Sequence, residues 1–368
     1  MNLAAADHAY EVAVLGAGSG GLALCGALAL RGYRLRLWNR DPARLQPLRE
    51  AGHIRLRGCI VADVPVPPCT TDLAEAVRGA DVILVVTTAG AHEAIAARLA
   101  PLLEAGQCVL LCPGRTGGAI VVRQTLERMG CADGVLVAEA QSLVYACRAD
   151  AACVNLIGVK ALVPVAADPA ADTNAVMQRV RPLFDCFRAA PSVLHTGLEN
   201  IGAIFHPAIV LFNAAAIERD KGFYLYRDMT PRVAECLVAL DRERIAIGAA
   251  FGIALYSIFD WIKRAYPLTE GDTLCERLRN NPAYNDILAP TRLDSRLLTE
   301  DLPTGLVPMA ELGTTAGIET PLMDALIDLG GALLGRDFRA EGRTLERLGL
   351  AHLNSSQIIT HLKGGRVL

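Results

Sequence analysis

The pattern of apolar and polar positions at the start of the chain predicts a strand, a glycine-rich turn and a helix. Residues 10–15 are apolar and rich in valine, and they run into Gly16-Ala17-Gly18-Ser19-Gly20-Gly21 before a helical stretch at 22–31. Gly32 follows as a helix C-cap would, and residues 34–38 alternate basic and apolar side chains as a second strand does. The chain therefore opens with a βαβ unit.

Beyond this unit, apolar runs continue to alternate with helical stretches. Strands that alternate with helices imply a parallel sheet with helices on its faces. We therefore predict an α/β fold whose N-terminal part is a doubly wound, mostly parallel sheet of the Rossmann type. Its remaining segments are predicted as strands at 82–87, 107–112 and 135–138, a helix at 91–103, antiparallel edge strands within 154–165, a helix at 174–187 and a last strand at 192–196.

From residue 199 onward the pattern changes to helical stretches with few strand signals. Helices are predicted at 199–219 and 231–254, and the polar stretch 267–317 predicts short helices with loops. At 368 residues the chain exceeds the usual span of one hydrophobic core. We therefore predict two domains, a Rossmann domain at 1–197 and an all-α domain at 198–368 that binds substrate and carries the catalytic groups.

Two Thr-Pro pairs mark the expected starts of helices in the second domain. Thr230 precedes Pro231, and Thr320 precedes Pro321 before a helix that ends near Gly335. A threonine hydroxyl can cap free amides, and proline suits the first helical turn. Both threonines are therefore predicted as helix caps.

Composition and charge narrow the function classes. Hydrophobic residues make up 52% and charged residues 20% of the chain, which is typical of a globular protein. The formal net charge of -3 gives no electrostatic footprint for nucleic acid, so no nucleic-acid partner is expected. The eleven cysteines include no CxxC pair, which disfavours disulfide and zinc frameworks, predicts no metal site and favours a reducing cytoplasm.

One uncharged stretch, residues 12–30, is long enough to suggest a membrane helix. Its glycines fall at turn and close-packing positions, and Asp7 and Glu11 precede it in place of the basic start of a signal peptide. We therefore expect neither a membrane span nor a secretory signal here.

The spacing Gly16-x-Gly18-x-x-Gly21, between a strand and a helix, is typical of dinucleotide binding. Gly16 permits the tight turn, Gly18 lets the backbone approach a pyrophosphate and Gly21 lets the helix pack on the strand. The predicted cofactor-binding residues of the turn are Gly16, Gly18, Ser19, Gly20 and Gly21. The alternative is a glycine turn that binds no nucleotide.

The end of the second strand bears on the choice between NAD and NADP. NAD enzymes usually place an acid there for the ribose hydroxyl, whereas this chain has Asn39 followed by Arg40. An asparagine removes repulsion toward a 2′-phosphate, and a guanidinium binds phosphate in a forked geometry, so NADP is favoured over NAD. Alternatively, Arg40 is a solvated surface residue and Asp41 takes the role of the acid.

His206 lies within an apolar segment early in the first helix of the second domain. Taken alone, a histidine in such a place is more often a hydrogen-bonded core residue than a catalytic one. The residues themselves leave both alternatives open.

The chain resembles the opine dehydrogenases, the octopine and nopaline dehydrogenase family. Both predicted domains carry the resemblance. The matching stretches are Gly16 to Gly21, Asn200 to Pro207 with its His-Pro pair, Thr230-Pro231 leading to Asp241-Arg242-Glu243-Arg244, and Arg296 to Pro308 with Glu300, Asp301, Pro303 and Gly305.

The resemblance implies a function. Members of the family use NAD(P)H to condense a 2-oxo acid such as pyruvate with the amino group of an amino acid through an imine. It also implies His206 as the acid/base group, Asp301 as its orienting partner and Arg296 as a nearby site residue. Since Arg296 and Asp301 are five residues apart and share no helical or strand face, a turn must aim both inward. The alternative for these two charges is a surface ion pair or loop residues.

Weaker substrate-binding candidates are Asn200, Arg115 and Glu139, each of which is equally explained as a local polar contact. Tyr224 and Tyr226 are further residues that we expect to line the cleft or to pack there. The expected partners are the two small-molecule substrates, with a homodimer left open.

Two other function classes stay open from the sequence. A simple 2-oxo acid reductase of the ketopantoate reductase type typically uses a lysine in the corresponding helix, and residues 199–219 contain none. A dinucleotide-binding protein without catalysis is expected to lack the polar residues named above.

Overall fold

The structure is a computed structural model that describes residues 10–364, and these form two compact units. One unit comprises the residues up to 114 together with 118–193, and the other comprises 115–117 together with the residues from 194 onward. The sequence analysis predicted a domain boundary between residues 197 and 198, and this boundary stays a prediction. It did not place the short segment 115–117 with the second unit.

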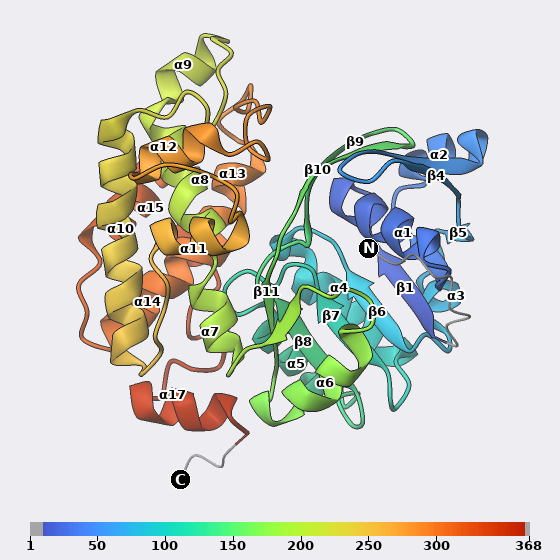
Figure 1. Cartoon of the computed structure of the whole chain (residues 1–368). Coiled ribbons are helices and arrows are strands. Elements are labelled where there is room, and N and C mark those ends of the chain that lie inside the picture. Colours follow the sequence, from blue (N-terminus) through green and yellow to red (C-terminus); the bar gives the residue numbers. More distant parts are fainter. Residues whose placement is uncertain (1–9, 365–368) are drawn as a thin grey trace. The chain divides into compact units, whose positions relative to one another are not determined.

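An eight-stranded sheet forms the centre of the first unit, in the order β12-β11-β8-β7-β6-β1-β2-β5. Its paired strands run parallel except for β11, which runs antiparallel to β8. The central strands are apolar on both faces because helices cover the sheet on both sides (Figure 1). The strands are β1 (Glu11–Leu15), β2 (Arg34–Trp38), β5 (Cys69–Thr70), β6 (Val82–Val85), β7 (Cys108–Leu111), β8 (Leu136–Ala140), β11 (Val163–Ala167) and β12 (Phe187–Ala189).

The order of the strands reverses beside β1, which lies between β2 and β6. In doubly wound sheets, ligands bind outside the carboxyl ends of the strands at such a reversal. The glycine turn 16–21 follows the carboxyl end of β1 and leads into α1. The helices of this unit are α1 (Ser19–Leu30), α2 (Gln46–Ala51), α3 (Leu73–Val77), α4 (His92–Leu99), α5 (Gly118–Arg128) and α6 (Thr173–Val180).

A second sheet of four strands, which the sequence analysis did not predict, packs against α1. A β-carbon on Gly26 would lie 2.7 Å from a methyl carbon of Leu56, so helix and sheet are in close contact there. The second sheet explains why α1, which makes up most of the uncharged stretch 12–30, is so apolar. The helix is buried by one sheet on each side. The strands are β3 (His53–Gly58), β4 (Ala62–Pro65), β9 (Tyr145–Asp150) and β10 (Cys153–Val159), in the order β4-β3-β10-β9.

The predicted last strand of the first domain is wrong. Residues 193–198 form the helix α7 (Val193–Leu198), and the edge strand β12 comes earlier, at Phe187–Ala189. An apolar run this short does not distinguish a buried strand from a buried helix of about one and a half turns, because the two contain the same few apolar residues.

The second unit is helical, and its described residues from 194 to 364 contain no strand beyond one isolated bridge. The predicted fold class, a mostly parallel Rossmann sheet followed by a helical domain, is therefore confirmed. The elements are α8 (Ile201–Phe212), α9 (Ala214–Glu218), α10 (Pro231–Ala250), α11 (Ile258–Ala265), α12 (Leu274–Asn280), α13 (Arg296–Thr299), the π-helical turn η5 (Leu302–Leu306), α14 (Val307–Thr315), α15 (Pro321–Leu334), α16 (Phe338–Glu341) and α17 (Ser355–Leu362).

Helices α10 and α15 begin at the two Thr-Pro pairs, but the threonine hydroxyls do not cap them. The hydroxyl of Thr320 donates to Asp324 instead. The carboxylate of Glu243 on α10 accepts hydrogen bonds from the amides of Leu322 and Met323, at 2.8 and 3.0 Å. The carboxylate of Glu243 thus caps α15 in place of the Thr320 hydroxyl. An anion can do this because it accepts hydrogen bonds from the free amides of a helix N-terminus.

A buried ion pair holds α10 within the second unit. Arg244 Nε lies 2.7 Å from Asp241 Oδ1, and both residues are almost fully buried. The remaining groups are also paired, because Arg244 donates to the carbonyl of Leu198 and Asp241 Oδ2 accepts from the amide of Ile258. The Asp241 to Arg244 stretch that carries the family resemblance is therefore structural.

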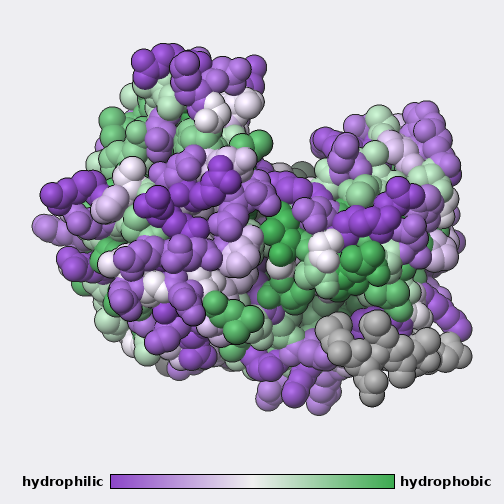
Figure 2. All heavy atoms as spheres, turned by 45° about the horizontal axis from the view of Figure 1, so that its top comes forward, coloured by the Kyte–Doolittle hydropathy of each residue, from purple (hydrophilic) through white to green (hydrophobic). Residues whose placement is uncertain are grey.

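No helix within residues 10–364 is both long enough and apolar enough to span a membrane. Figure 2 shows hydrophilic areas alternating with smaller hydrophobic ones on one face of the molecule.

Candidate active site

The three glycines of the Gly16-x-Gly18-x-x-Gly21 motif differ in what surrounds them. Gly16 has a φ of +122°, and a β-carbon there would lie 2.4 Å from the carbonyl oxygen of Val86. A β-carbon on Gly21 would lie 1.7 Å from the carbonyl oxygen of Gly16. Gly18 has open space, with no described atom within 4 Å of the position of its β-carbon. The fold itself therefore requires the outer two glycines, while the backbone at Gly18 is open to a ligand.

Ser19 and Gly20 connect the turn to the second sheet and the loop beside it. The Ser19 hydroxyl oxygen accepts a hydrogen bond from the amide of Ala149 at 2.9 Å. A β-carbon on Gly20 would lie 2.9 Å from a methyl carbon of Leu143. Ser19 can still donate its proton to a ligand, because the bond to Ala149 uses only an oxygen lone pair.

Asn39 at the end of β2 holds the glycine turn. Its Oδ1 accepts from the amide of Ala17 at 3.0 Å, and its Nδ2 donates to the carbonyl of Asp41 at 3.0 Å. Arg40 is exposed, and the carboxylate of Asp41 accepts from the amide of Ala43. Arg40 and Asp41 are thus both exposed to solvent, but the Asp41 carboxylate is also engaged with the turn that follows it.

Glu139 on β8 is fully buried in the first unit. Its Oε2 accepts a hydrogen bond from the amide of Ala119 at 2.8 Å, in the first turn of α5. Close packing restricts the carboxylate further, since a β-carbon on Gly114 would lie 2.4 Å from it. Substrate binding by Glu139 stays a prediction, and the contacts described for this residue are with the start of α5 and with Gly114.

In the second unit, α8 places His206 next to Pro207, inside the helix. A proline inside a helix has no amide hydrogen to give to the carbonyl four residues earlier. One turn before His206 lies Gly202, where a β-carbon would be 2.6 Å from an Arg115 nitrogen and 3.3 Å from the imidazole. Gly202 therefore leaves the room in which a guanidinium can approach this face of α8.

His206 and Asp301 form a hydrogen-bonded pair. Nδ1 of His206 lies 2.7 Å from Oδ2 of Asp301, with 17% of the histidine side chain and none of the aspartate exposed. Close packing of η5 on α8 brings them together: a β-carbon on Gly305 would lie 2.4 Å from that of Ala203. The partly exposed imidazole can exchange protons, while the carboxylate fixes its orientation.

Arg115 is the second partner of the aspartate. Its φ is +62°, a left-handed conformation that is uncommon outside glycine, and its guanidinium lies 3.2 Å from Asp301 Oδ1. It also lies 3.4 Å from Glu300 and donates to Asn200 at 3.3 Å. Burial alone would raise the pKa of the Asp301 carboxyl, but Arg115 and then His206 outweigh it, so that this pKa is lowered.

Backbone bonds fix the segment 115–117 within the second unit. The amide of Thr116 donates to the carbonyl of Thr304 at 3.1 Å, and its hydroxyl donates to the carbonyl of Gly197 at 2.9 Å. Arg343 in turn donates to the carbonyl of Thr116 at 3.1 Å. These bonds hold Thr116 and, through it, the backbone that follows Arg115.

Asn200 and Arg296 occupy different surroundings. Asn200 is buried and bonds Arg115 and, through Nδ2, the hydroxyl of Thr116 at 3.4 Å. The side chain of Arg296, at the start of α13, is 54% exposed and lies 3.4 Å from Glu300. Glu300 thus lies 3.4 Å from both Arg115 and Arg296. Asp301 is buried, whereas Arg296 is accessible to a ligand from solvent.

The polar cluster around His206 and Asp301 also includes Glu300 and Tyr226. The sequence analysis assigned no catalytic or binding role to either. Glu300 precedes Asp301 directly and was only part of a motif, while Tyr226 was expected either to line the cleft or to pack there. The Tyr226 hydroxyl lies 3.1 Å from Nε2 of His206. Tyr224 lies elsewhere, with the Arg227 guanidinium 3.3 Å from its ring centroid. Nothing in the local spacing separates the two tyrosines, because the contact is long-range.

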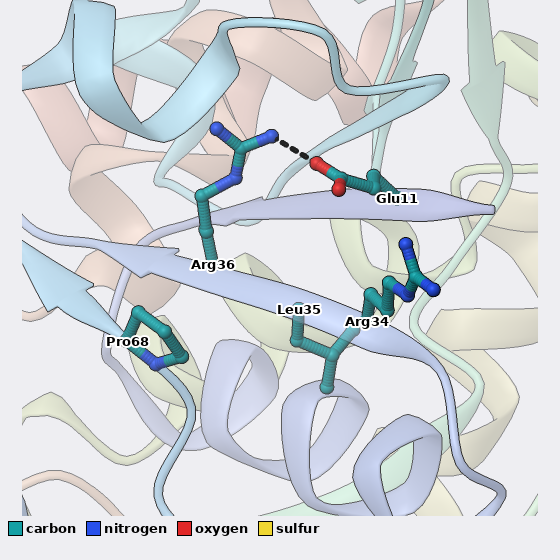
Figure 3. Close-up of a pocket in the computed structure, with 5 residues that line it drawn as sticks. All are labelled: Glu11, Arg34, Leu35, Arg36 and Pro68. Atoms are coloured by element: carbon teal, nitrogen blue, oxygen red, sulfur yellow. Dashed lines mark hydrogen bonds and ion pairs between the residues drawn. The ribbon is translucent and has the colours of Figure 1, made fainter. Parts of the chain in front are cut away.

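A surface cavity of about 480 Å³ in the first unit lies away from the glycine turn. Figure 3 shows Glu11 and Arg36 pointing toward one another at this cavity, with Arg34, Leu35 and Pro68 around it. Glu11 and Arg34 are the first residues of β1 and β2, whereas the glycine turn follows the other end of β1. Ligands of such sheets bind at the carboxyl ends of the strands, so this cavity is not the dinucleotide site.

Comparisons with known proteins agree with this arrangement. The family model described as NAD/NADP octopine/nopaline dehydrogenase, alpha-helical domain, matches residues 189–334, and that of the NAD-dependent glycerol-3-phosphate dehydrogenase N-terminus matches 11–115. The chain is 38% identical over 349 residues to an opine dehydrogenase of Arthrobacter sp. (strain 1C), covering 94% of this chain and 97% of that protein.

Solved structures share the fold. An octopine dehydrogenase with NADH and L-arginine has a TM-score of 0.77 at 22% identity, covering 98% of this chain and 99% of that one. A yersinopine dehydrogenase with bound NADP+ has a TM-score of 0.71 at 16% identity, covering 96% of this chain and 98% of that one.

Proposed function

The chain belongs to the opine dehydrogenase family, and from this premise we propose that it reductively condenses a 2-oxo acid, such as pyruvate, with the amino group of an amino acid. The observation that carries the proposal is the pair His206–Asp301, a partly exposed imidazole hydrogen-bonded to a buried carboxylate. Forming an imine requires protons to be moved to and from the carbonyl oxygen and the amine, which is the work of such a pair.

Five residues of the cluster have a role in this proposal. His206 exchanges protons with the substrate, and Asp301 orients the imidazole and stabilises its protonated form. Arg296, with 54% of its side chain exposed, binds a substrate carboxylate in a forked geometry. Arg115 and Asn200 support Asp301 and the segment 115–117.

The first unit is proposed to bind NAD(P)H at the glycine turn, which when bound supplies the hydride that reduces the imine. The open backbone at Gly18, at the start of α1, fits a pyrophosphate approaching a helix N-terminus. We propose that NADP is preferred to NAD, because Arg40 is exposed and Asn39 brings no negative charge. A comparison of KM for NADPH and NADH tests this, and a clear preference for NADH would contradict it.

We also propose a cytoplasmic enzyme, since all eleven cysteines are free thiols. A reducing compartment keeps such thiols from oxidation.

The proposed condensation is tested by following oxidation of NADPH with pyruvate alone, and then with pyruvate and pools of amino acids, with mass analysis of the product. We expect a rate that requires both partners and a product whose mass is that of a secondary amine dicarboxylate. The same rate with the oxo acid alone would show a simple reductase and overturn the proposal.

A further inference from the structure

Both ring nitrogens of His206 are engaged within the second unit. Nδ1 lies 2.7 Å from Asp301, and Nε2 lies 3.1 Å from the hydroxyl of Tyr226. An imidazole has no third nitrogen. Any proton that His206 exchanges with a substrate must therefore pass through Nε2, at the position that the Tyr226 hydroxyl occupies.

Packing holds the tyrosine ring at this position. Tyr226 is 4% exposed, its ring is stacked on that of Tyr284 with centroids 4.4 Å apart, and the edge contact with Phe205 has centroids 6.1 Å apart. Aromatic pairs at these separations stabilise a fixed geometry. The hydroxyl therefore cannot leave Nε2 without breaking up a packed aromatic cluster.

The backbone around Tyr226 is also anchored. The amide of Leu225 donates to the carbonyl of Ile287 at 2.8 Å, and that of Met229 donates to the carbonyl of Tyr226 at 3.1 Å. An isolated β-bridge joins Tyr224 to Leu288 on the same side. Moving the tyrosine would thus disturb the two segments that carry Tyr226 and Tyr284.

We propose that the Tyr226 hydroxyl is a further catalytic residue, through which His206 exchanges protons with the substrate oxygen. This inference rests on the proposed condensation. A phenol hydroxyl has one donor and two acceptor positions, so it can accept from Nε2–H while it donates to a substrate oxygen. On the side of His206, Tyr226 therefore already lies within hydrogen-bond distance for a relay and need not move.

The step balances as follows in the direction of synthesis. The amine nitrogen forms a bond to the carbonyl carbon of the oxo acid, and the π electron pair of the C=O bond moves to oxygen. That oxygen takes the proton of the Tyr226 hydroxyl, while Tyr226 takes the Nε2 proton of the His206 imidazolium. The substrate oxygen gains one proton, His206 loses one, and Tyr226 ends as it began.

The chain offers a matched control for the test. Tyr226→Phe removes only the hydroxyl at His206, whereas Tyr284→Phe removes a hydroxyl from the ring stacked on it. We expect kcat to fall about 100-fold in Tyr226→Phe, as is typical for loss of a proton-transfer group. We expect KM to stay nearly constant in that variant, and kcat of Tyr284→Phe to stay close to that of the wild type.

A second readout separates a relay from a structural role. In single-turnover experiments in mixtures of H₂O and D₂O, two protons moving together give a curved dependence of rate on deuterium fraction, and one proton gives a line. We expect a curve for the wild type and a line for Tyr226→Phe. A linear dependence in the wild type overturns the relay, even if a variant fails to fold.

A third measurement uses the protein without substrate. The ¹⁵N resonance of His206 Nε2 reports its hydrogen bond, and we expect it to shift in Tyr226→Phe but not in Tyr284→Phe. Equal kcat in the two variants, or an unshifted resonance, overturns the relay alone. Absence of any condensation by the wild type would instead overturn the proposed function.

Discussion

Nδ1 of His206 lies 2.7 Å from Oδ2 of Asp301, a residue 95 positions further along the chain. The π-helical turn that follows Asp301 packs on α8, where Gly305 has no side chain to keep it from Ala203. Such turns are frequent at functional sites. The dyad thus depends on a small-residue contact one turn away from the charges themselves.

Replacing Asp301 by Asn tests what the carboxylate does for the imidazole. An amide cannot stabilise the protonated ring and can reverse the hydrogen bond at Nδ1, so we expect kcat to fall roughly 10³-fold. The affinity for NADPH, measured by fluorescence, should not change. Glu300→Gln, which removes the neighbouring charge, should cost far less; equal losses in both variants would argue against a specific role of Asp301.

The charge of Arg115 should affect how the free energy of unfolding depends on pH. Because the pKa of the Asp301 carboxyl is lowered in the fold, this group stabilises the protein above its ordinary value of 3.8, and the contribution is lost as pH falls through the folded value. Without Arg115, the largest of the effects that lower this pKa is lost, so the pKa of Asp301 rises. We expect Arg115→Met to lower the free energy of unfolding at pH 7 by about 3 kcal/mol.

This loss in Arg115→Met should begin to shrink as the pH falls below about 4, and it should disappear only below the lowered folded pKa of Asp301, where the carboxyl is protonated in both folded and unfolded chains. Urea unfolding at pH 7 and in acid measures it. Arg292→Met, which breaks an exposed pair with Asp294, is the control and should leave the free energy of unfolding nearly unchanged at either pH. A loss that does not vary with pH would count against the ionic role of Arg115.

The surroundings of the glycines in the turn predict that one substitution weakens NADPH binding without changing Tm and that another lowers Tm. At Gly18 a methyl group meets no protein atom within 4 Å, so Gly18→Ala should leave Tm unchanged while raising the Kd for NADPH about tenfold by blocking the pyrophosphate. Gly21→Ala places a carbon 1.7 Å from a carbonyl oxygen and should lower Tm. Unchanged affinity in Gly18→Ala would place the dinucleotide elsewhere.

Arg244 should matter for stability. Arg244→Met leaves the buried carboxylate of Asp241 without its partner and the carbonyl of Leu198 without a donor. Breaking a buried pair from one side costs about 3–5 kcal/mol, which we expect as a loss in the free energy of unfolding. A variant of wild-type stability would show that the pair contributes little.

Local patterns were enough to predict the central strands of the main sheet and the four longest helices, but not the edge strands β5 and β12 or the helix α5. Residues 34–38 were predicted and found as a strand, and the helix after Thr320-Pro321 ends where Gly335 takes a left-handed conformation. The second sheet was missed, although Ile54 and Leu56 alternate with Arg55 and Arg57 as a half-buried strand does. It consists of two pairs of neighbouring strands, β3 with β4 and β9 with β10, that are far apart in sequence, so only the long-range pairing of β3 with β10 joins them.

The candidate site was only partly accessible to sequence analysis. The family resemblance suggested His206, Asp301 and Arg296, but no spacing rule places Arg115 beside Glu300, which lies 185 residues away. The same holds for the cap that Glu243 provides to α15. Long-range polar contacts leave no periodic trace, so the partners of each charge emerged only from the fold.

The most direct test of the account is the kinetics of His206→Asn, a replacement that is smaller but still polar. We predict that kcat for the condensation of pyruvate with an amino acid falls roughly 10³-fold while the Kd for NADPH is unchanged. Retention of kcat within about tenfold of the wild type would contradict the assignment of His206 as the acid/base group.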